Sequence, residues 1–121
     1  MTLVQAAELG RYGITSNALA PSARTRMTED TFAEMMKKPE SGFDKMDPDN
    51  ISPLVACLGS EDAGDITGCV LEIAGGMVSV CDGWRTGPFR DKEARWEAAE
   101  LGDVLRELVA EGEAPQKVHG T

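Results

Sequence analysis

The distribution of apolar and polar positions along the chain predicts four helices. The clearest stripe stands at i, i+3, i+4 and i+7, and its members are Ile51, Leu54, Val55 and Leu58. A second stripe predicts a final helix from about Asp91, with Leu101, Val104, Leu105, Leu108 and Val109 on one face. Shorter stretches predict a first helix that stops at Gly10, and a helix from about Glu29 to Lys38 with Phe32, Met35 and Met36 on its apolar face.

Two further stretches have the character of β-strands. The first, residues 14–20, is apolar and lies between Gly13 and Pro21. The second lies within residues 66–80, where Val70, Leu71 and Ile73 predict a mostly buried strand. A turn at residues 75–76 and a candidate additional strand follow it.

The predicted order is helix, strand, helix, helix, strand, helix. Strands separated by helices pair in parallel through a right-handed crossover, so this order indicates the α/β class and a part of a doubly wound parallel sheet. Two strands with flanking helices are incomplete as a domain, because parallel sheets are normally covered on both faces. We therefore expect one open hydrogen-bonding edge, along residues 15–19.

Composition narrows the classes of partner. The 121 residues include 12 Lys and Arg against 21 Asp and Glu, a net charge of −9, which repels nucleic-acid backbones and anionic membranes. Three cysteines without a C-x-x-C pair predict free thiols in a reducing compartment and no metal site. With no apolar leader or membrane-spanning stretch in the sequence, we expect a cytoplasmic location.

Four separated motifs follow one another in a recognisable order. They are G-I-T-S-N-A-L-A-P at 13–21, the helix of residues 52–59, D-I-T-G at 65–68 and G-G at 75–76. In this order they resemble the later strands, helix and turn of the short-chain dehydrogenase/reductase (SDR) family. A-P-S-A-R-T-R-M-T at 20–28, S-P-L-V at 52–55 and G-W-R at 83–85 are similar to the (3R)-hydroxyacyl-CoA dehydrogenase unit of peroxisomal multifunctional enzyme type 2 and its bacterial relatives. The resemblance implies that residues 1–111 form the C-terminal segment of a Rossmann-like SDR domain and that residues 112–121 form a flexible tail.

The resemblance also implies a nicotinamide cofactor, NAD or NADP, and the oxidation of a secondary alcohol such as a 3-hydroxyacyl-CoA. In the family, the loop after the first of these strands touches the nicotinamide ring and carboxamide. Pro21, Ser22, Ala23 and Thr25 occupy those places here, although Ser22 replaces the common Gly. These four residues are the predicted cofactor-binding site.

No catalytic residue is predicted within the chain. The family's catalytic Ser and its Tyr-x-x-x-Lys pair are absent, since Tyr12 is followed four residues later by Ser16. No G-x-G-x-x-G occurs either, and His119 stands alone in the polar tail. We therefore expect the chain by itself to be inactive.

Two residue-level alternatives stay open. Thr25 or Thr28 could serve only as the N-cap of the following helix, because threonine is a good capping residue. Met27, Met35 and Met36 could line an acyl-chain pocket, but methionines at helical spacing are more often core residues.

Two functions remain in competition. The chain could be part of a dehydrogenase whose activity belongs to a complete SDR polypeptide. It could instead be a non-catalytic interaction or structural subunit that pairs through its open sheet edge, as a homo-oligomer or with a complete SDR.

Overall fold

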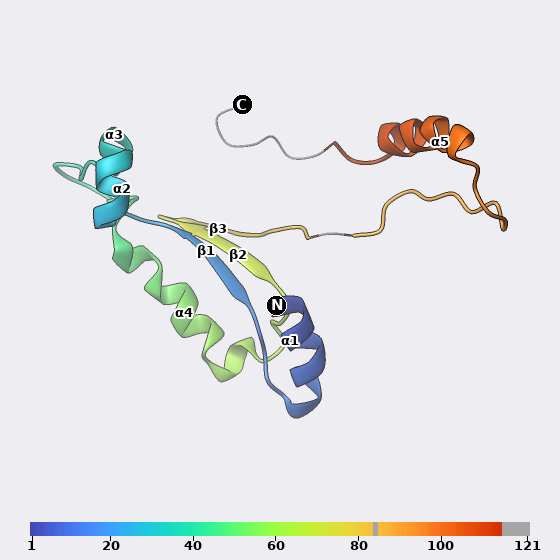
Figure 1. The fold of residues 1–121 in the computed structure, drawn as a ribbon. Helices are drawn as coiled ribbons and strands as arrows, with labels where there is room; N and C mark the ends of the chain where they lie inside the picture. Colours follow the sequence, from blue (N-terminus) through green and yellow to red (C-terminus); the bar gives the residue numbers. More distant parts are fainter. Residues whose placement is uncertain (84, 115–121) are drawn as a thin grey trace. The chain divides into compact units, whose positions relative to one another are not determined.

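A computed structural model describes residues 1–83 and 85–114 of the protein. The chain divides into two compact units, Met1–Gly83 and Trp84–Thr121, each considered by itself. The first unit contains, in order, α1 (Thr2–Leu9), η1 (Gly10–Tyr12), β1 (Ala18–Ser22), α2 (Arg26–Thr31), α3 (Ala33–Met36), η2 (Pro48–Asn50), α4 (Ser52–Leu58), η3 (Glu61–Ala63), β2 (Val70–Ala74) and β3 (Met77–Val80). The second unit contains α5 (Ala98–Glu111) (Figure 1).

A mixed sheet with the order β1-β2-β3 organises the first unit. β1 and β2 are parallel and in register from Ala18↔Val70 to Ser22↔Ala74, as the alternation of helices and strands predicted. The α/β class and the partial Rossmann-like architecture are thus confirmed. The sheet has three strands instead of two, because the candidate additional strand is present as β3, which pairs with β2 in antiparallel orientation through a two-residue loop. The first residue of that loop, Gly75, has a φ of 57°, a conformation that such a tight hairpin requires.

β1 begins and ends later than the sequence predicted, at Ala18 and Ser22 in place of residues 14 and 20. The preceding segment is held through the side chain of Asn17, which accepts a hydrogen bond from the Cys69 amide at 3.1 Å and donates to the Ile66 carbonyl at 2.8 Å. Proline has no N–H, so within a strand it is tolerated where its nitrogen faces an unpaired edge. The Ala18 N–H points toward β2, and because backbone groups alternate along a strand, the nitrogen of Pro21, three residues further on, faces the opposite edge. Within the described residues, that edge of β1 has no partner strand.

The helices near residue 30 also differ from the prediction. The expected single helix over 29–38 is divided into α2 and α3 at Phe32, whose φ of −129° and ψ of 47° are not helical. Of the predicted apolar stripe only Met36 is buried, whereas Phe32 and Met35 are about half exposed.

The second unit contains α5, which begins at Ala98 and not near Asp91. The Glu97 side chain accepts from the backbone at N3, and the Glu100 side chain accepts from the Glu97 amide, so a capping box fixes this start. Ion pairs of Arg90 with Glu111 and of Lys92 with Glu100 join the preceding segment to the helix. Most of the tail predicted for 112–121 lies outside the described residues, so that prediction stays untested.

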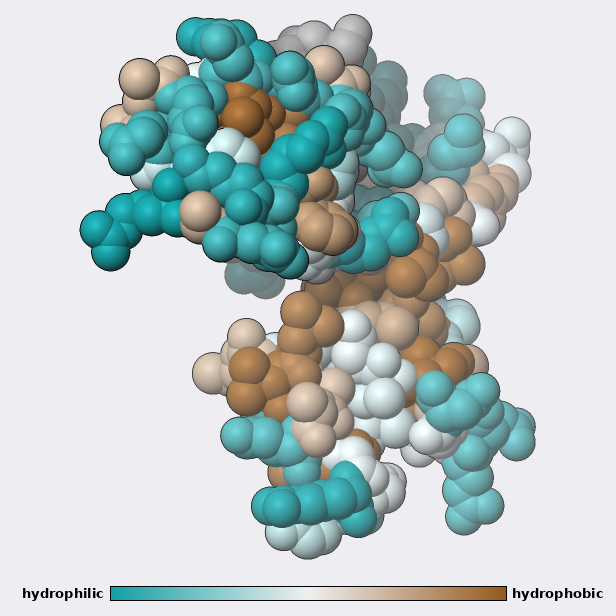
Figure 2. All heavy atoms as spheres, turned by 90° about the vertical axis from the view of Figure 1, so that its right-hand side faces the viewer, coloured by the Kyte–Doolittle hydropathy of each residue, from teal (hydrophilic) through white to brown (hydrophobic). Residues whose placement is uncertain are grey.

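Little apolar surface is buried in the part of the chain that the structure describes. The buried apolar residues there are Met36, Ala63, Leu71 and Ile73. Large apolar side chains on every strand are exposed or partly exposed, among them Val78 and Val80 of β3, which are 60% and 64% exposed. Figure 2 shows apolar atoms reaching the molecular surface on the face that it draws. The first unit therefore presents apolar surface that a complete doubly wound domain would cover.

None of the described helices is both long and apolar enough to span a bilayer.

Candidate functional site

The predicted cofactor-binding residues follow one another at the carboxyl end of β1. Pro21 and Ser22 are the last two residues of the strand and are exposed, Ala23 is half-buried, and Thr25 is exposed directly before α2. Because β1 and β2 are parallel and in register, β2 ends beside them, at Ala74. Ligands of doubly wound folds bind outside the carboxyl ends of the strands, so the predicted loop lies at the edge where a nucleotide is expected.

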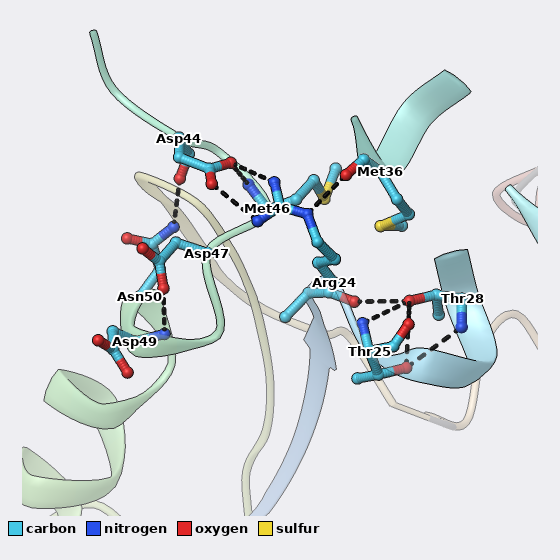
Figure 3. Close-up of polar contacts among 10 residues, drawn as sticks. Arg24, Thr25, Thr28, Met36, Asp44, Met46, Asp47, Asp49 and Asn50 are labelled. Atoms are coloured by element: carbon cyan, nitrogen blue, oxygen red, sulfur yellow. Dashed lines mark hydrogen bonds and ion pairs between the residues drawn. The ribbon is translucent and has the colours of Figure 1, made fainter. Parts of the chain in front are cut away.

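Thr25 and Thr28 form a reciprocal capping box at the start of α2. The Thr28 amide donates to Thr25 Oγ1 at 3.2 Å, and the Thr25 amide donates to Thr28 Oγ1 at 2.7 Å. Thr28 Oγ1 is also 3.2 Å from the Ala23 carbonyl oxygen and 3.1 Å from that of Thr25. The alternative that these threonines cap the helix is therefore realised in the structure (Figure 3).

Capping does not exhaust the hydrogen-bonding capacity of Thr25. A hydroxyl has one hydrogen to donate and two lone pairs that accept, and the cap needs Thr25 Oγ1 as an acceptor. When Thr28 donates its own hydrogen to the Ala23 carbonyl, the Thr25 hydrogen can be donated either to Thr28 Oγ1, 3.1 Å away, or to a ligand. Capping and cofactor binding by Thr25 are thus compatible, and its role in cofactor binding stays a prediction.

Arg24, between Ala23 and Thr25, makes a bidentate ion pair with Asp44. Its Nη1 and Nη2 donate to the two carboxylate oxygens at 2.9 and 2.8 Å, and its Nε donates to the Met36 carbonyl at 2.6 Å. The two side chains are only 15% and 12% exposed. The hydrogen bond between them lowers the pKa of Asp44 and raises the pKa of Arg24, so both groups stay charged at neutral pH.

Asp44 is itself held by the loop that contains it. Its Oδ1 accepts from the Met46 amide at 3.1 Å, and its backbone carbonyl accepts from the Asn50 side chain at 2.8 Å. The Met46 carbonyl in turn accepts from the Arg24 amide at 2.7 Å. Figure 3 shows Arg24 with its partners from the end of α3 and the loop that follows, and Asn50 of η2 bonded to Asp44.

The same loop approaches the β2–β3 turn closely. A Cβ atom placed on Gly75 would lie 3.0 Å from the Lys45 carbonyl oxygen and 3.2 Å from the Lys45 Cα. The loop after β1 and the turn after β2 are therefore both in contact with residues 44–46, which joins the ends of the two parallel strands.

Sequence reasoning missed the Arg24–Asp44 pair. Arg24 lies within the motif quoted above, but its partner is 20 residues away in a turn-rich segment where no spacing rule applies. The capping box, by contrast, is local and was one of the two alternatives for Thr25 and Thr28.

The other candidate residues offer no proton-transfer group at this site. Tyr12 belongs to η1, is 65% exposed, and has the Arg11 guanidinium 4.8 Å from the centre of its ring. Ser16 Oγ donates to Gln5 at 3.1 Å. His119 lies outside the described residues, and among the described ones no cluster of three or more His, Cys, Asp or Glu side chains could hold a metal. Met27, one of the three methionines considered for an acyl-chain pocket, is 83% exposed.

Comparison with known proteins relates the chain to one class of enzyme. No protein-family model matches it. The hydroxyacyl-CoA dehydrogenase ChsB1 of Mycobacterium tuberculosis is 31% identical over 122 residues, which cover 100% of this chain and 38% of that protein. The (3R)-3-hydroxyacyl-CoA dehydrogenase of Mus musculus is 38% identical over 88 residues, covering 64% of this chain and 31% of that protein.

A solved structure also relates the chain to dehydrogenases. The crystal structure of a short chain dehydrogenase from Mycobacterium avium matches with a TM-score of 0.75 and 47% identity, covering 99% of this chain and 36% of that one. The chain thus spans between about three tenths and two fifths of the length of these relatives. Sequence and fold together show that the chain is related to the short-chain dehydrogenases/reductases and corresponds to a part of their length.

Proposed function

We propose that the chain is the C-terminal portion of an NAD- or NADP-dependent dehydrogenase that oxidises the secondary alcohol of a 3-hydroxyacyl-CoA-like substrate. Its contribution is the loop of residues 21–25, which binds the nicotinamide end of the cofactor. The observation that carries the proposal is the position of this loop at the carboxyl end of β1, with exposed Pro21, Ser22 and Thr25. Relatives that are named as hydroxyacyl-CoA dehydrogenases support the class of substrate.

The donor set of the loop fits a nicotinamide carboxamide. A carboxamide presents a carbonyl oxygen that accepts and an NH2 group that donates, and the loop offers the Thr25 hydroxyl beside backbone groups of an exposed strand end. When bound, the cofactor supplies the acceptor for the hydride. The residues of this chain orient the cofactor. The charged pair beside the loop, Arg24 and Asp44, is engaged in hydrogen bonds within the protein.

The isolated chain is expected to be inactive. Acid–base catalysis contributes about 10² to 10⁴ in rate, and the described loop contains no group that could provide it. The check is to incubate the purified chain with NAD, NADP and a (3R)-3-hydroxyacyl-CoA. Turnover near the rate of a complete enzyme would contradict the assignment.

A chimaera tests the proposal directly. The segment of ChsB1 that matches this chain is replaced by residues 1–121, and binding of NAD and NADP and oxidation of a hydroxyacyl-CoA are measured. We expect the folded chimaera to bind one of the two cofactors and to oxidise the substrate. A folded chimaera that binds neither cofactor, while unaltered ChsB1 binds one under the same conditions, would refute the proposal.

A second candidate is an interaction subunit that pairs through β1, with itself or with a complete SDR. It is favoured by the edge of β1 that has no partner strand among the described residues, and by the small number of buried apolar side chains there. It predicts that the purified chain self-associates, or binds ChsB1, in light-scattering measurements. A compact monomer with a sharp cooperative melt would contradict it.

A further inference from the structure

The two ends of the segment from α2 to α3 are hydrogen-bonded to two adjacent residues, Thr25 and Arg24. Its first helix is capped by Thr25, and the carbonyl of Met36, the last residue of its second helix, accepts a hydrogen bond from Arg24 Nε at 2.6 Å. The helix carbonyls at a C-terminus have no partner within the helix, so this bond supplies one. Both ends of the segment are thus attached to the loop after β1.

We propose that Arg24 is a positioning residue for this loop, which it holds in one place by joining the loop to α3 and to Asp44. The inference rests on the proposed function where it concerns the cofactor, because Arg24 acts through Ala23 and Thr25 and not by contact with the nicotinamide. Its own backbone amide is also fixed, by the Met46 carbonyl at 2.7 Å.

The chemistry of the pair explains why an arginine stands here. A guanidinium presents its donors in a rigid planar fork, and three of its nitrogens are engaged, two with Asp44 and one with Met36. A lysine ammonium could reach one of these acceptors well but not all three in this planar geometry. The position of Asp44 is fixed in turn by the Met46 amide, so the partner cannot easily follow a displaced cation.

A network in which each of these groups has a partner restricts the loop before any ligand arrives. Binding is tighter when the binding groups are already ordered, because less conformational entropy is lost on association. Loss of the Arg24 contacts should therefore weaken cofactor binding even though no contact with the cofactor has been removed.

The first experiment uses the complete 121-residue chain and needs no cofactor. Amide hydrogen exchange is compared for the unaltered chain, Arg24→Lys and Arg106→Lys. The control is matched in chemistry, since Arg106 pairs with Asp103 at 2.9 Å, but that pair is 77% and 88% exposed on α5. The reporters are the amides of Glu29, Phe32 and Met36, which are hydrogen-bonded within or at the ends of α2 and α3.

We expect Arg24→Lys to accelerate exchange at these three amides by about tenfold or more. The amides at the start of the β1–β2 pairing, those of Ala18 and Gly68, should exchange at an unchanged rate, and Arg106→Lys should change neither group. Equal acceleration at the sheet amides would show a general loss of stability and overturn the inference, as would no acceleration at all.

The second experiment measures cofactor affinity and steady-state kinetics in the ChsB1 chimaera. Arg24→Lys should raise the cofactor Kd about tenfold, with a smaller effect on kcat at saturating cofactor, whereas Arg106→Lys should change neither. Unchanged affinity in Arg24→Lys despite faster exchange of α2 and α3 would overturn the positioning role. If the chimaera with Arg24 intact binds no cofactor, the proposed function fails, the cofactor part of the inference fails with it, and the exchange data alone decide whether Arg24 holds the segment.

Discussion

Replacement of Thr25 by valine removes a hydroxyl while keeping the shape of the side chain, and the structure separates its two consequences. The cap loses the bond from the Thr28 amide to Thr25 Oγ1, 3.2 Å long. Loss of an N-cap costs about 1 kcal/mol. We expect this cost to appear as faster opening of α2, by about fivefold, because 1.4 kcal/mol corresponds to a factor of ten.

The second consequence concerns the cofactor. If Thr25 donates its hydrogen to the nicotinamide carboxamide, Thr25→Val leaves that group unpaired, at a cost of about 1 to 3 kcal/mol. Cofactor affinity in the ChsB1 chimaera should then fall by about five- to a hundredfold. The assay is a titration of NAD or NADP, monitored alongside the melting temperature.

Two matched variants complete the design. Thr25→Ser keeps a hydroxyl and serves as an equally good cap, so both affinity and stability should be preserved. Thr28→Val removes the shorter bond of the box, the one from the Thr25 amide at 2.7 Å, and should destabilise α2 at least as much as Thr25→Val. Because Thr28 is not expected to touch the cofactor, its affinity loss should be the smaller one. A chimaera carrying Thr25→Val that binds cofactor as tightly as Thr25→Ser would refute the cofactor role and leave only the cap.

Three further changes probe the framework of the site. The hydrogen bond from Arg24 lowers the pKa of Asp44, so the pair stabilises the fold fully at pH values above the ordinary Asp pKa of about 3.9. This stabilisation is lost as the pH falls through the lowered pKa. In denaturation curves at several acidic pH values, Asp44→Asn should therefore reduce the pH dependence of the free energy of unfolding. In urea denaturation, Gly75→Ala should lower the free energy of unfolding more than Gly13→Ala. Both residues have a positive φ, 57° and 72°, which costs an alanine about 1 to 2 kcal/mol at either position. Only at Gly75 would the new Cβ also lie 3.0 Å from a backbone oxygen. Asn17→Ala removes both hydrogen bonds of the Asn17 side chain to the segment before β2, and it should lower the free energy of unfolding by about 1 to 3 kcal/mol in the same assay. An unchanged denaturation midpoint would show that these two bonds do not stabilise the fold.

The parts of the fold that the sequence predicted are those that depend on local periodicity. The stripe at 51–58 corresponds to α4, and the strand predicted within residues 66–80 corresponds to β2. The expected continuous helix over 29–38 is wrong because apolar spacing does not report the break at Phe32, whose side chain is half exposed. The start of α5 was misplaced for a related reason, since a capping box at Glu97 and not the apolar stripe sets its first turn.

The candidate site follows the same division. Thr25 and Thr28 are three residues apart, so a capping box between them can be proposed from spacing alone. Asp44 could not be assigned to Arg24 in this way, because the intervening chain includes two helices and a turn-rich loop whose path is set by tertiary contacts.

Three consecutive residues of the loop after β1 each make an interaction with a later part of the first unit. Ala23 presents a carbonyl to Thr28, Arg24 binds α3 and Asp44, and Thr25 caps α2. These contacts all lie inside the first unit and include no strand other than those described, so they can form without the sheet neighbours that an SDR domain would place beside β1. Completion of the sheet edge and order in the loop are therefore separable properties. We expect the free edge of β1 to govern association with another polypeptide, and the order of the loop after β1 to govern how tightly the cofactor binds.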